Sequence, residues 1–291
     1  MRLATTIITA ATVALGVALW VSHTQPQSGL TTPTNTAFER VMQTGVIRCG
    51  YAAWDPMLKV DPTTKKVSGI AHDVFEAAAK YLGLKVEWTE ELTWGEFPLA
   101  LQNHRVDAFC MGSPTSAERA RATLQTDPFL FTKFVVAVRS DDKRLVHNPH
   151  DLNKPETKFG QVDGTLQVKL VPRLFPQATF LIYPESIPLS QLLLDVGENK
   201  LDAALIGLSM VAIYNQSHPG RLTALEGPGI GRFLPNVIFV GPHEPRLRDM
   251  LNVALMDVLD TGLVGQAVAR YQIVPDAYRL PASPYAGMAT Q

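Results

Sequence analysis

Arg119 is the residue whose type and position most clearly indicate binding chemistry. It lies in the first turn of an expected helix, which Thr115 and Glu118 open as a capping box. A guanidinium offers a rigid fork that matches a carboxylate, and a helix start adds free backbone N–H groups. The pattern therefore predicts an anion site at Arg119, whereas we expect Arg121 to be an ordinary surface arginine.

Strand and helix patterns alternate along the chain, which predicts an α/β fold around a largely parallel sheet. The first part has expected strands at 46–51, 85–88, 105–112 and 134–139 and helices at 73–82 and 93–103. A second, similar part has strands at 158–162, 200–206 and 236–240, a helix at 187–196, and final helices at 245–259 and 263–271.

The bulk composition excludes several classes of function. The chain has 291 residues, 46% of them hydrophobic, and a net charge of −1, which gives no electrostatic case for nucleic-acid binding. Neither a Cys/His metal spacing nor a hydrolase motif is present, and His147 with His150 is an isolated pair in a polar loop. We therefore expect no metal and no cofactor.

The N-terminus differs from the rest of the chain. Arg2 precedes an apolar run at 3–21, which is either a signal peptide or an uncleaved anchor of nearly bilayer-spanning length. No cysteine follows it for lipid attachment, and residues 22–36 have the polar, Thr- and Pro-rich composition of a flexible linker. In both cases the body of the protein is exported.

Four consecutive segments, at 46–51, 68–73, 105–112 and 113–119, resemble the periplasmic solute-binding proteins of amino-acid-type ABC transporters, bacterial extracellular solute-binding protein family 3. The resemblance covers about 37–275. It implies a two-lobed type II periplasmic binding protein fold with a double-strand hinge. It also implies that the chain returns to the first lobe near its end, which the pattern alone does not indicate.

The resemblance and the composition together give a division of the chain. We expect a signal peptide or anchor at 1–21, a linker at 22–36, lobe 1 at 37–138 and 238–275, lobe 2 at 139–237, and a Pro-rich tail at 276–291.

The resemblance also implies where a ligand carboxylate is held. In the family, the positions of Arg119, Gly112 and Ser113 contact the carboxylate from one lobe. The turn that begins Gly164-Thr165-Leu166-Gln167 matches the second anion site, with Thr165 as hydroxyl donor and Gln167 beside it; helix capping is the alternative role of Thr165.

Two positions of these motifs depart from the family pattern. Pro114 and Leu166 stand where the family usually has Ser or Thr, so each removes a donor and weakens the clamp.

Aromatic residues are expected to form the walls of the same site. Trp54 and Trp94 fall where the family places aromatic walls around the ligand, and both lie on loops rather than on a repeating apolar stripe. Tyr51 is expected near the same cleft. Such rings give apolar contact and attract a cation over their faces.

The acids that pair with an α-ammonium in the family are absent. Their positions are occupied by Gly207 and Ala52, and Asp163 or Glu185 would have to substitute for them. We therefore expect a ligand with a carboxylate but without an ordinary α-ammonium.

Cys49 and Cys110 lie on strands that are neighbours in the family's sheet. An oxidising compartment favours a disulfide, but bridges between adjacent parallel strands are geometrically awkward. A disulfide and two buried thiols both remain open.

These observations predict an exported protein that captures a small organic anion or amino-acid-like solute between two lobes. The expected partners are this ligand and an ABC permease in the inner membrane, with the protein itself a monomer in the periplasm or tethered to the inner membrane. A membrane-tethered ligand sensor or accessory protein is the alternative. A dehydratase-like enzyme on the same fold is disfavoured because Ile206 and Gly207 offer no general acid.

Overall fold

The computed structural model describes residues 36–142, 148–227 and 229–282. Its contacts separate Met1–Thr36 from a compact unit formed by Ala37–Gln291. The expected signal peptide or anchor at 1–21, nearly all of the linker, His147 and the last residues of the tail lie outside the described residues.

The compact unit is a mixed α/β structure whose larger sheet has eleven strands. The strands are β1 (Val46–Tyr51), β4 (Lys85–Glu91), β5 (Ala108–Pro114), β6 (Leu124–Gln125), β7 (Leu130–Arg139), β8 (Lys158–Val162), β9 (Thr179–Tyr183), β10 (Ala203–Gly207), β11 (Leu222–Leu225), β12 (Arg232–Val240) and β13 (Tyr278–Arg279). A separate hairpin pairs β2 (Lys59–Val60) with β3 (Val67–Ser68).

Helices cover this sheet. They are α2 (Ala37–Thr44), α3 (Ile70–Tyr81), α4 (Phe97–Gln102), α5 (Ala117–Ala122), α6 (Gln167–Leu174), α7 (Leu189–Gly197), α8 (Leu208–Ser217), α9 (Pro245–Asp260), α10 (Leu263–Tyr271) and a short 3-10 helix, η1 (Pro149–Leu152).

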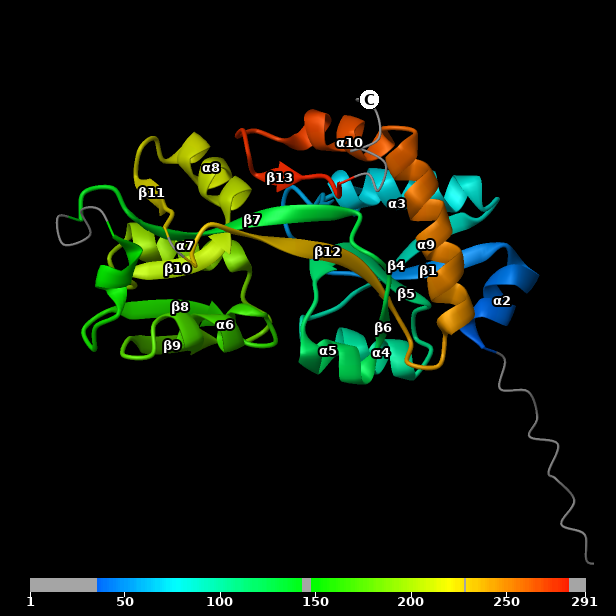
Figure 1. The fold of residues 1–291 in the computed structure, drawn as a ribbon, viewed down its shortest axis with the longest axis horizontal. Coiled ribbons are helices and arrows are strands. Elements are labelled where there is room, and N and C mark those ends of the chain that lie inside the picture. The colour runs from blue at the N-terminus through cyan, green and yellow to red at the C-terminus, as the bar shows by residue number, and fades with distance from the viewer. Residues whose placement is uncertain (1–35, 143–147, 228, 283–291) are drawn as a thin grey trace, which may run out of the picture. The chain divides into compact units, whose positions relative to one another are not determined.

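Figure 1 shows two lobes joined by two long strands, β7 and β12. Lobe 1 contains β1, β4, β5 and β6 with α2 to α5, α9 and α10, and lobe 2 contains β8 to β11 with α6 to α8. The α/β class and the two-lobed fold expected from the sequence are confirmed. The residue boundaries assigned to the lobes remain a prediction.

The two joining strands are longer than the sequence pattern indicated. They pair antiparallel with Arg232 opposite Phe134 and Asn236 opposite Leu130, so pairing starts before the expected strands at 134–139 and 236–240. β12 then pairs with β5 in lobe 1, while β7 pairs with β10 in lobe 2. One continuous sheet therefore passes through both lobes and includes β5 and β10.

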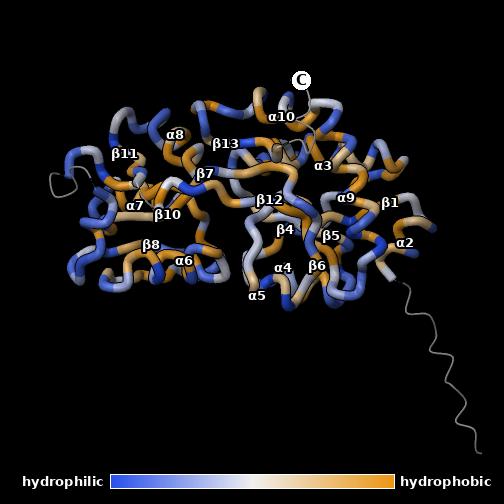
Figure 2. The backbone as a smooth tube through the Cα atoms, in the orientation of Figure 1, coloured by the Kyte–Doolittle hydropathy of each residue, from blue (hydrophilic) through white to orange (hydrophobic). Residues whose placement is uncertain are grey.

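The interior of each lobe is apolar, as Figure 2 shows for the strands at the centre of the sheet. Phe97 stacks on Phe109 in lobe 1 with ring centroids 4.4 Å apart, and Phe159 stacks on Phe175 in lobe 2 at 4.6 Å. Helix α9 begins and ends within a residue of the prediction, because its apolar spacing is regular. Helix α3 begins earlier than expected, at Ile70, directly after Gly69, whose φ is 126°.

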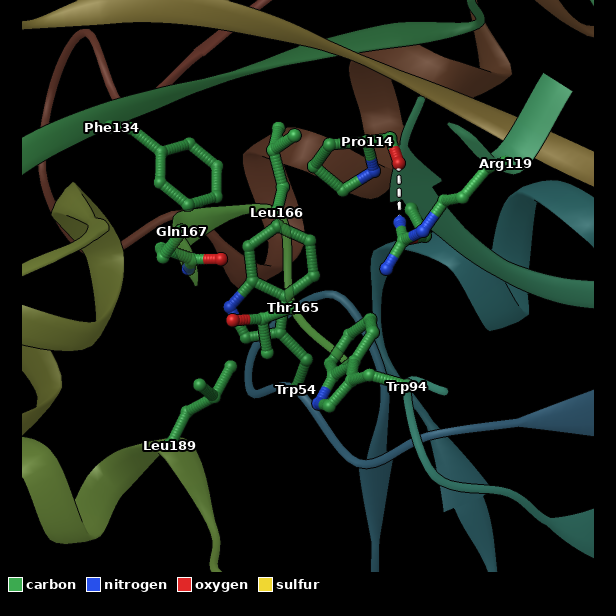
Figure 3. A pocket seen from close by; sticks show the side chains of 10 residues that line it. Trp54, Trp94, Pro114, Arg119, Phe134, Thr165, Leu166, Gln167 and Leu189 are labelled. Carbon is green, nitrogen blue, oxygen red and sulfur yellow. Dashed lines mark hydrogen bonds between the residues drawn. The ribbon is translucent and has the colours of Figure 1, made fainter. Parts of the chain in front are cut away.

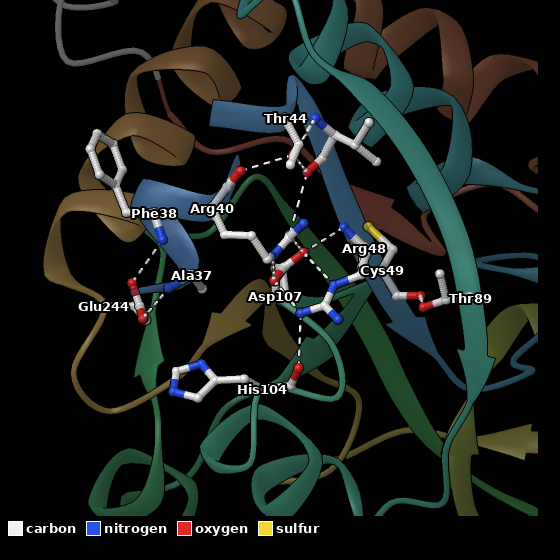
Figure 4. Close-up of polar contacts among 12 residues, drawn as sticks. Ala37, Phe38, Arg40, Thr44, Arg48, Cys49, Thr89, His104, Asp107 and Glu244 are labelled. Atoms are coloured by element: carbon white, nitrogen blue, oxygen red, sulfur yellow. Dashed lines mark hydrogen bonds and ion pairs between the residues drawn. The ribbon is translucent and has the colours of Figure 1, made fainter. Parts of the chain in front are cut away.

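A disulfide and a cluster of ionic hydrogen bonds fix the first strands of lobe 1. Cys49 and Cys110 form a disulfide between the neighbouring strands β1 and β5, with a Cα–Cα distance of 5.6 Å. The buried carboxylate of Asp107 accepts hydrogen bonds from the Arg48 backbone N–H at 2.7 Å and from the side chains of Arg40 and Arg48 (Figure 4). Asp107 therefore fixes the chain just before β5. The strand begins at Ala108, whereas the sequence predicted a start at Arg105.

The two ends of the compact unit are also held. Glu244 accepts the backbone N–H groups of Ala37 at 2.6 Å and Phe38 at 3.1 Å, which satisfies two free donors of helix α2 (Figure 4). The predicted Pro-rich tail contains a short strand, β13, which pairs with β7. In the described part of the chain, no single helix is long and apolar enough to cross a bilayer, although α9 and α10 pass the length and composition test as a pair bent by 72°.

Candidate functional site

A small pocket lies where the two lobes meet, which we call the inner pocket. It is lined by Trp54, Trp94, Ser113, Pro114, Arg119, Phe134, Thr165, Leu166, Gln167 and Leu189 (Figure 3). Its cavity volume is about 20 Å³, which is room for about one water molecule. In this arrangement of the lobes, the side chains that line the inner pocket leave little free volume in it.

Arg119 is held in place by groups of both lobes. Its Nη1 donates to Ser113 Oγ at 2.9 Å and to the Pro114 carbonyl at 2.5 Å, and its Nη2 donates to the Gly164 carbonyl at 3.2 Å. The helix that carries it is capped by Ser116, whose hydroxyl accepts the Arg119 N–H at 3.2 Å. The prediction that Thr115 caps this helix was wrong, because the Thr115 hydroxyl forms a hydrogen bond with the Gln125 side chain instead.

The charge of Arg119 is buried. The residue is 8% exposed, and its guanidinium carbon lies 5.1 Å from the centroid of the Phe97 ring. Burial lowers the pKa of Arg119 to about 10, so the side chain stays protonated at neutral pH. A guanidinium has five N–H donors, and three of them are used by these acceptors. The Nε–H and one Nη2–H make no hydrogen bond to the described residues.

The lobe 2 side of the pocket differs from the expected helix start. Helix α6 begins at Gln167, with Leu166 as the preceding residue, and the Thr165 hydroxyl donates to the Val162 carbonyl at 2.6 Å. Thr165 therefore neither caps the helix nor points a free hydroxyl proton into the pocket, although its oxygen lines it. Gln167 is 7% exposed and also lines the pocket.

Trp54 and Trp94 lie together on the pocket wall, as predicted from their loop positions. Their ring centroids are 6.3 Å apart in an edge arrangement, and Trp54 Nε1 donates to Met210 Sδ of lobe 2 at 3.2 Å. Phe134, whose ring centroid is 5.9 Å from that of Trp54, was missed by the sequence reasoning. Phe134 lies in β7, one of the two strands that join the lobes, and this position was the sequence signal that could have indicated a place in the pocket.

Two predicted site residues do not line the inner pocket. Gly112 has a φ of 68°, and a Cβ there would lie 2.5 Å from Phe129, so its conformation and its neighbours favour glycine at this position. Its contact with a ligand stays a prediction. The ring of Tyr51 packs edge-on against Trp88 at 6.1 Å.

Among the described residues, no Asp or Glu lines the inner pocket. Gly207 occupies the position of the family's acid, and a Cβ built there would lie 3.5 Å from the Trp54 ring. The two possible substitutes accept backbone N–H groups: Asp163 from Gly164 at 2.9 Å and Glu185 from Gly95 at 3.1 Å.

A larger cavity of about 300 Å³, which we call the outer cavity, adjoins the inner pocket and shares Trp94, Arg119, Thr165 and Leu166 with it. Its lining includes Glu118 and Lys169, which form an ion pair at 3.8 Å between the lobes, and Asp163. Acidic groups therefore face the entrance of the cleft but not its interior, within the part of the chain that the structure describes. These residues also contain no group of three or more His, Cys, Asp or Glu side chains that could hold a metal ion.

Comparison with solved structures identifies the fold. The ancestral amino-acid-binding protein AncCDT-1, a precursor of cyclohexadienyl dehydratase, is 22% identical, with a TM-score of 0.70 over 81% of this chain and 99% of that one. A putative ABC transporter binding component from Wolinella succinogenes, complexed with lysine, is 20% identical, with a TM-score of 0.70 over 80% and 97%. An amino acid ABC transporter substrate-binding protein from Streptococcus pneumoniae, bound to L-arginine, is 14% identical, with a TM-score of 0.67 over the same shares.

Sequence comparison identifies the family. No curated protein sequence matches the chain significantly. A family model does match, over residues 47–273, which is most of the compact unit. The chain belongs to the bacterial extracellular solute-binding proteins, family 3.

Proposed function

We propose that this protein is an exported solute-binding protein that captures a small carboxylate between its lobes and delivers it to an ABC permease in the inner membrane. The carrying observation is the buried Arg119 in an inner pocket whose described lining residues include no Asp or Glu. Glu118, which lines the outer cavity, favours the charged form of Arg119, but the inner pocket itself offers no carboxylate among its described lining residues. A buried cation in such a pocket favours an anionic ligand, because the ligand then compensates for the lost hydration of the guanidinium.

The same charge arrangement disfavours an ordinary α-amino acid. The solved relatives described above bind lysine and L-arginine, whose α-ammonium requires an acceptor. Here Gly207 provides none, and Asp163 and Glu185 already accept backbone N–H groups. An unpaired buried ammonium costs several kcal/mol, which is enough to abolish micromolar binding.

Ligand entry requires the lobes to separate, because the inner pocket has room for about one water molecule. The paired strands β7 and β12 would serve as the hinge, with the lobes divided near residues 138 and 238. Ligand then shifts the population toward the closed form. Small-angle scattering tests this: the radius of gyration should decrease at saturating ligand, and identical curves would contradict closure.

We also propose that the protein acts without catalysis, as a periplasmic monomer. An enzyme on this fold needs a general acid in the cleft, and the polar groups of the inner pocket's described lining are hydroxyl, amide, indole and guanidinium groups, with no carboxyl or imidazole. Turnover of a bound carboxylate by the purified protein would contradict this.

A melting screen of small monocarboxylates, betaines and the twenty amino acids tests the ligand class. We expect carboxylates without an α-ammonium to raise the melting temperature and unmodified α-amino acids to have no effect. Micromolar binding of an amino acid that is lost in Asp163→Asn or Glu185→Gln would show instead that one of these acids completes a conventional amino-acid site.

A gain of function gives a sharper test. We expect Gly207→Asp to produce amino-acid binding that the wild type lacks, because it returns a carboxylate to the wall beside Trp54. Gly207→Asn is the matched control, since it has the same size and no charge. Calorimetry with neutral α-amino acids measures the difference, which should reach about tenfold or more in dissociation constant. Equal binding by both variants would contradict the proposed role of this position.

A further inference from the structure

Gln167 is a largely buried residue whose amide borders the inner pocket. It is 7% exposed, lines the inner pocket, and its amide makes no hydrogen bond to any residue in the described parts of the chain. Its polar atoms are not among the described buried atoms that lack a partner, so solvent in the pocket reaches them, and a ligand that displaces this solvent must supply the hydrogen bonds instead. The amide offers both donors and an acceptor, so it can satisfy either kind of neutral group.

The position of Gln167 relative to Arg119 is informative. Figure 3 shows Gln167 on one side of the pocket and Arg119 on the other, with the end of the Gln167 side chain turned toward the middle. The walls between them are mainly apolar, formed by Trp54, Phe134 and Leu166. A ligand that reaches from Arg119 to Gln167 would therefore carry its two polar groups at opposite ends of an apolar body.

We propose that Gln167 is a specificity-determining residue that binds a neutral hydrogen-bonding group, such as a hydroxyl, ketone or carboxamide, at the end of the ligand remote from its carboxylate. The proposal rests on the proposed capture of a carboxylate and specifies its class. An amide side chain pairs with such a group, whereas a second charge there would be buried without a counter-ion. The protein would accordingly discriminate against dicarboxylates and amino-carboxylates of the same length.

The argument depends on desolvation. A pocket that hydrogen-bonds a ligand group rejects the analogue that lacks it, because the protein group is then left unpaired. It rejects a charged analogue more strongly, because no described residue of the inner pocket provides an opposite charge at the Gln167 end.

Two series of probes that differ only in the group at the end remote from the carboxylate test the proposal on the whole protein. The aliphatic series is butanoate, gamma-hydroxybutyrate, succinamate, succinate and gamma-aminobutyrate. The aromatic series is benzoate, para-hydroxybenzoate, terephthalamate and terephthalate. In each series we expect a neutral polar end to bind at least about tenfold more tightly than the apolar end and than the charged ends.

Two variants assign this preference to Gln167. Gln167→Met keeps the size of the side chain and should reduce the preference for hydroxyl or carboxamide over the apolar end to about threefold or less. Gln161→Met is the matched control: its amide is buried without a partner in lobe 2, but it does not line the inner pocket, so the preference should persist. The melting temperature of each variant without ligand establishes that it is folded.

The outcomes separate this proposal from the one on which it rests. Binding of butanoate or benzoate as tight as that of their polar analogues would overturn the role of Gln167 while leaving carboxylate capture intact. A selectivity in Gln167→Met equal to that of the wild type would do the same. Failure of every carboxylate in both series to bind the wild type would instead refute carboxylate capture. If Gln167→Met does not fold, the selectivity of the wild type alone still decides whether a neutral polar end is preferred.

Discussion

The two walls of the site differ in how far the protein satisfies its own polar groups. On the lobe 1 wall, Arg119 donates to Ser113 Oγ and to the carbonyls of Pro114 and Gly164. On the lobe 2 wall, Thr165 bonds only to its own turn and Gln167 has no partner among the described residues. Lobe 1 therefore presents a cation already fixed in direction, and lobe 2 presents an amide whose partner must come with the ligand.

This difference indicates how affinity and selectivity are divided. A side chain fixed before binding loses little entropy when the ligand arrives, so the lobe 1 wall is suited to provide affinity. A ligand that displaces water from the Gln167 amide without replacing its hydrogen bonds loses about 1–3 kcal/mol, so the amide penalises ligands that do not satisfy it. The lobe 2 wall is accordingly suited to selection among carboxylates.

The largest expected effect follows from removing the disulfide of lobe 1. Replacing both Cys49 and Cys110 by alanine removes a cross-link between residues separated by 61 positions. Loop entropy predicts that the free energy of unfolding falls by about 4 kcal/mol. Denaturant titration measures this, with the wild type under reducing conditions as the comparison. An unchanged unfolding midpoint in the double variant would contradict it.

The next effect removes the fixed cation. Arg119→Ala should weaken carboxylate binding by roughly 2–4 kcal/mol, because a desolvated carboxylate loses its charged partner. Arg121→Ala is the control, since that arginine is exposed two positions later on the same helix. Calorimetry with the best carboxylate from the melting screen decides the matter. A dissociation constant unchanged in Arg119→Ala would remove Arg119 from the site and make the two walls equivalent.

The smallest effect concerns pH. Carboxylate affinity should be constant from about pH 6 to about pH 9, because the lowered pKa of Arg119, about 10, lies above this range. As pH rises through that value, Arg119 loses its proton and affinity falls. Over the same rise in pH, the free energy of unfolding increases, because the unfolded chain, in which the pKa of Arg119 is higher, binds more protons than the folded one. Calorimetry across the range is the measurement, and a marked change between pH 6 and 9 would indicate another titrating group at the site.

Part of the site was predicted from the helix start at Arg119 and, for Trp54 and Trp94, from the resemblance to the family. The structure places all three residues on the lining of one pocket, and their contact with a ligand stays a prediction. Phe134 was missed because a phenylalanine in a buried strand has the same local pattern whether it faces a core or a cleft. Gly112 and Tyr51 do not line this pocket, and their roles stay a prediction; neighbours distant in sequence, Phe129 and Trp88, lie beside them.

The sequence by itself determined the order of strands and helices, because hydrophobic periodicity is a local property. The two-lobed class and the absence of acids at Gly207 and Ala52 were implied by the resemblance of the sequence to its family. Only the tertiary structure decided that Gly164 of lobe 2 accepts a hydrogen bond from Arg119 and that Gln167 is left unpaired. Hydrogen bonds between residues 45 positions apart depend on how the lobes meet across β7 and β12, and no local pattern encodes that distance.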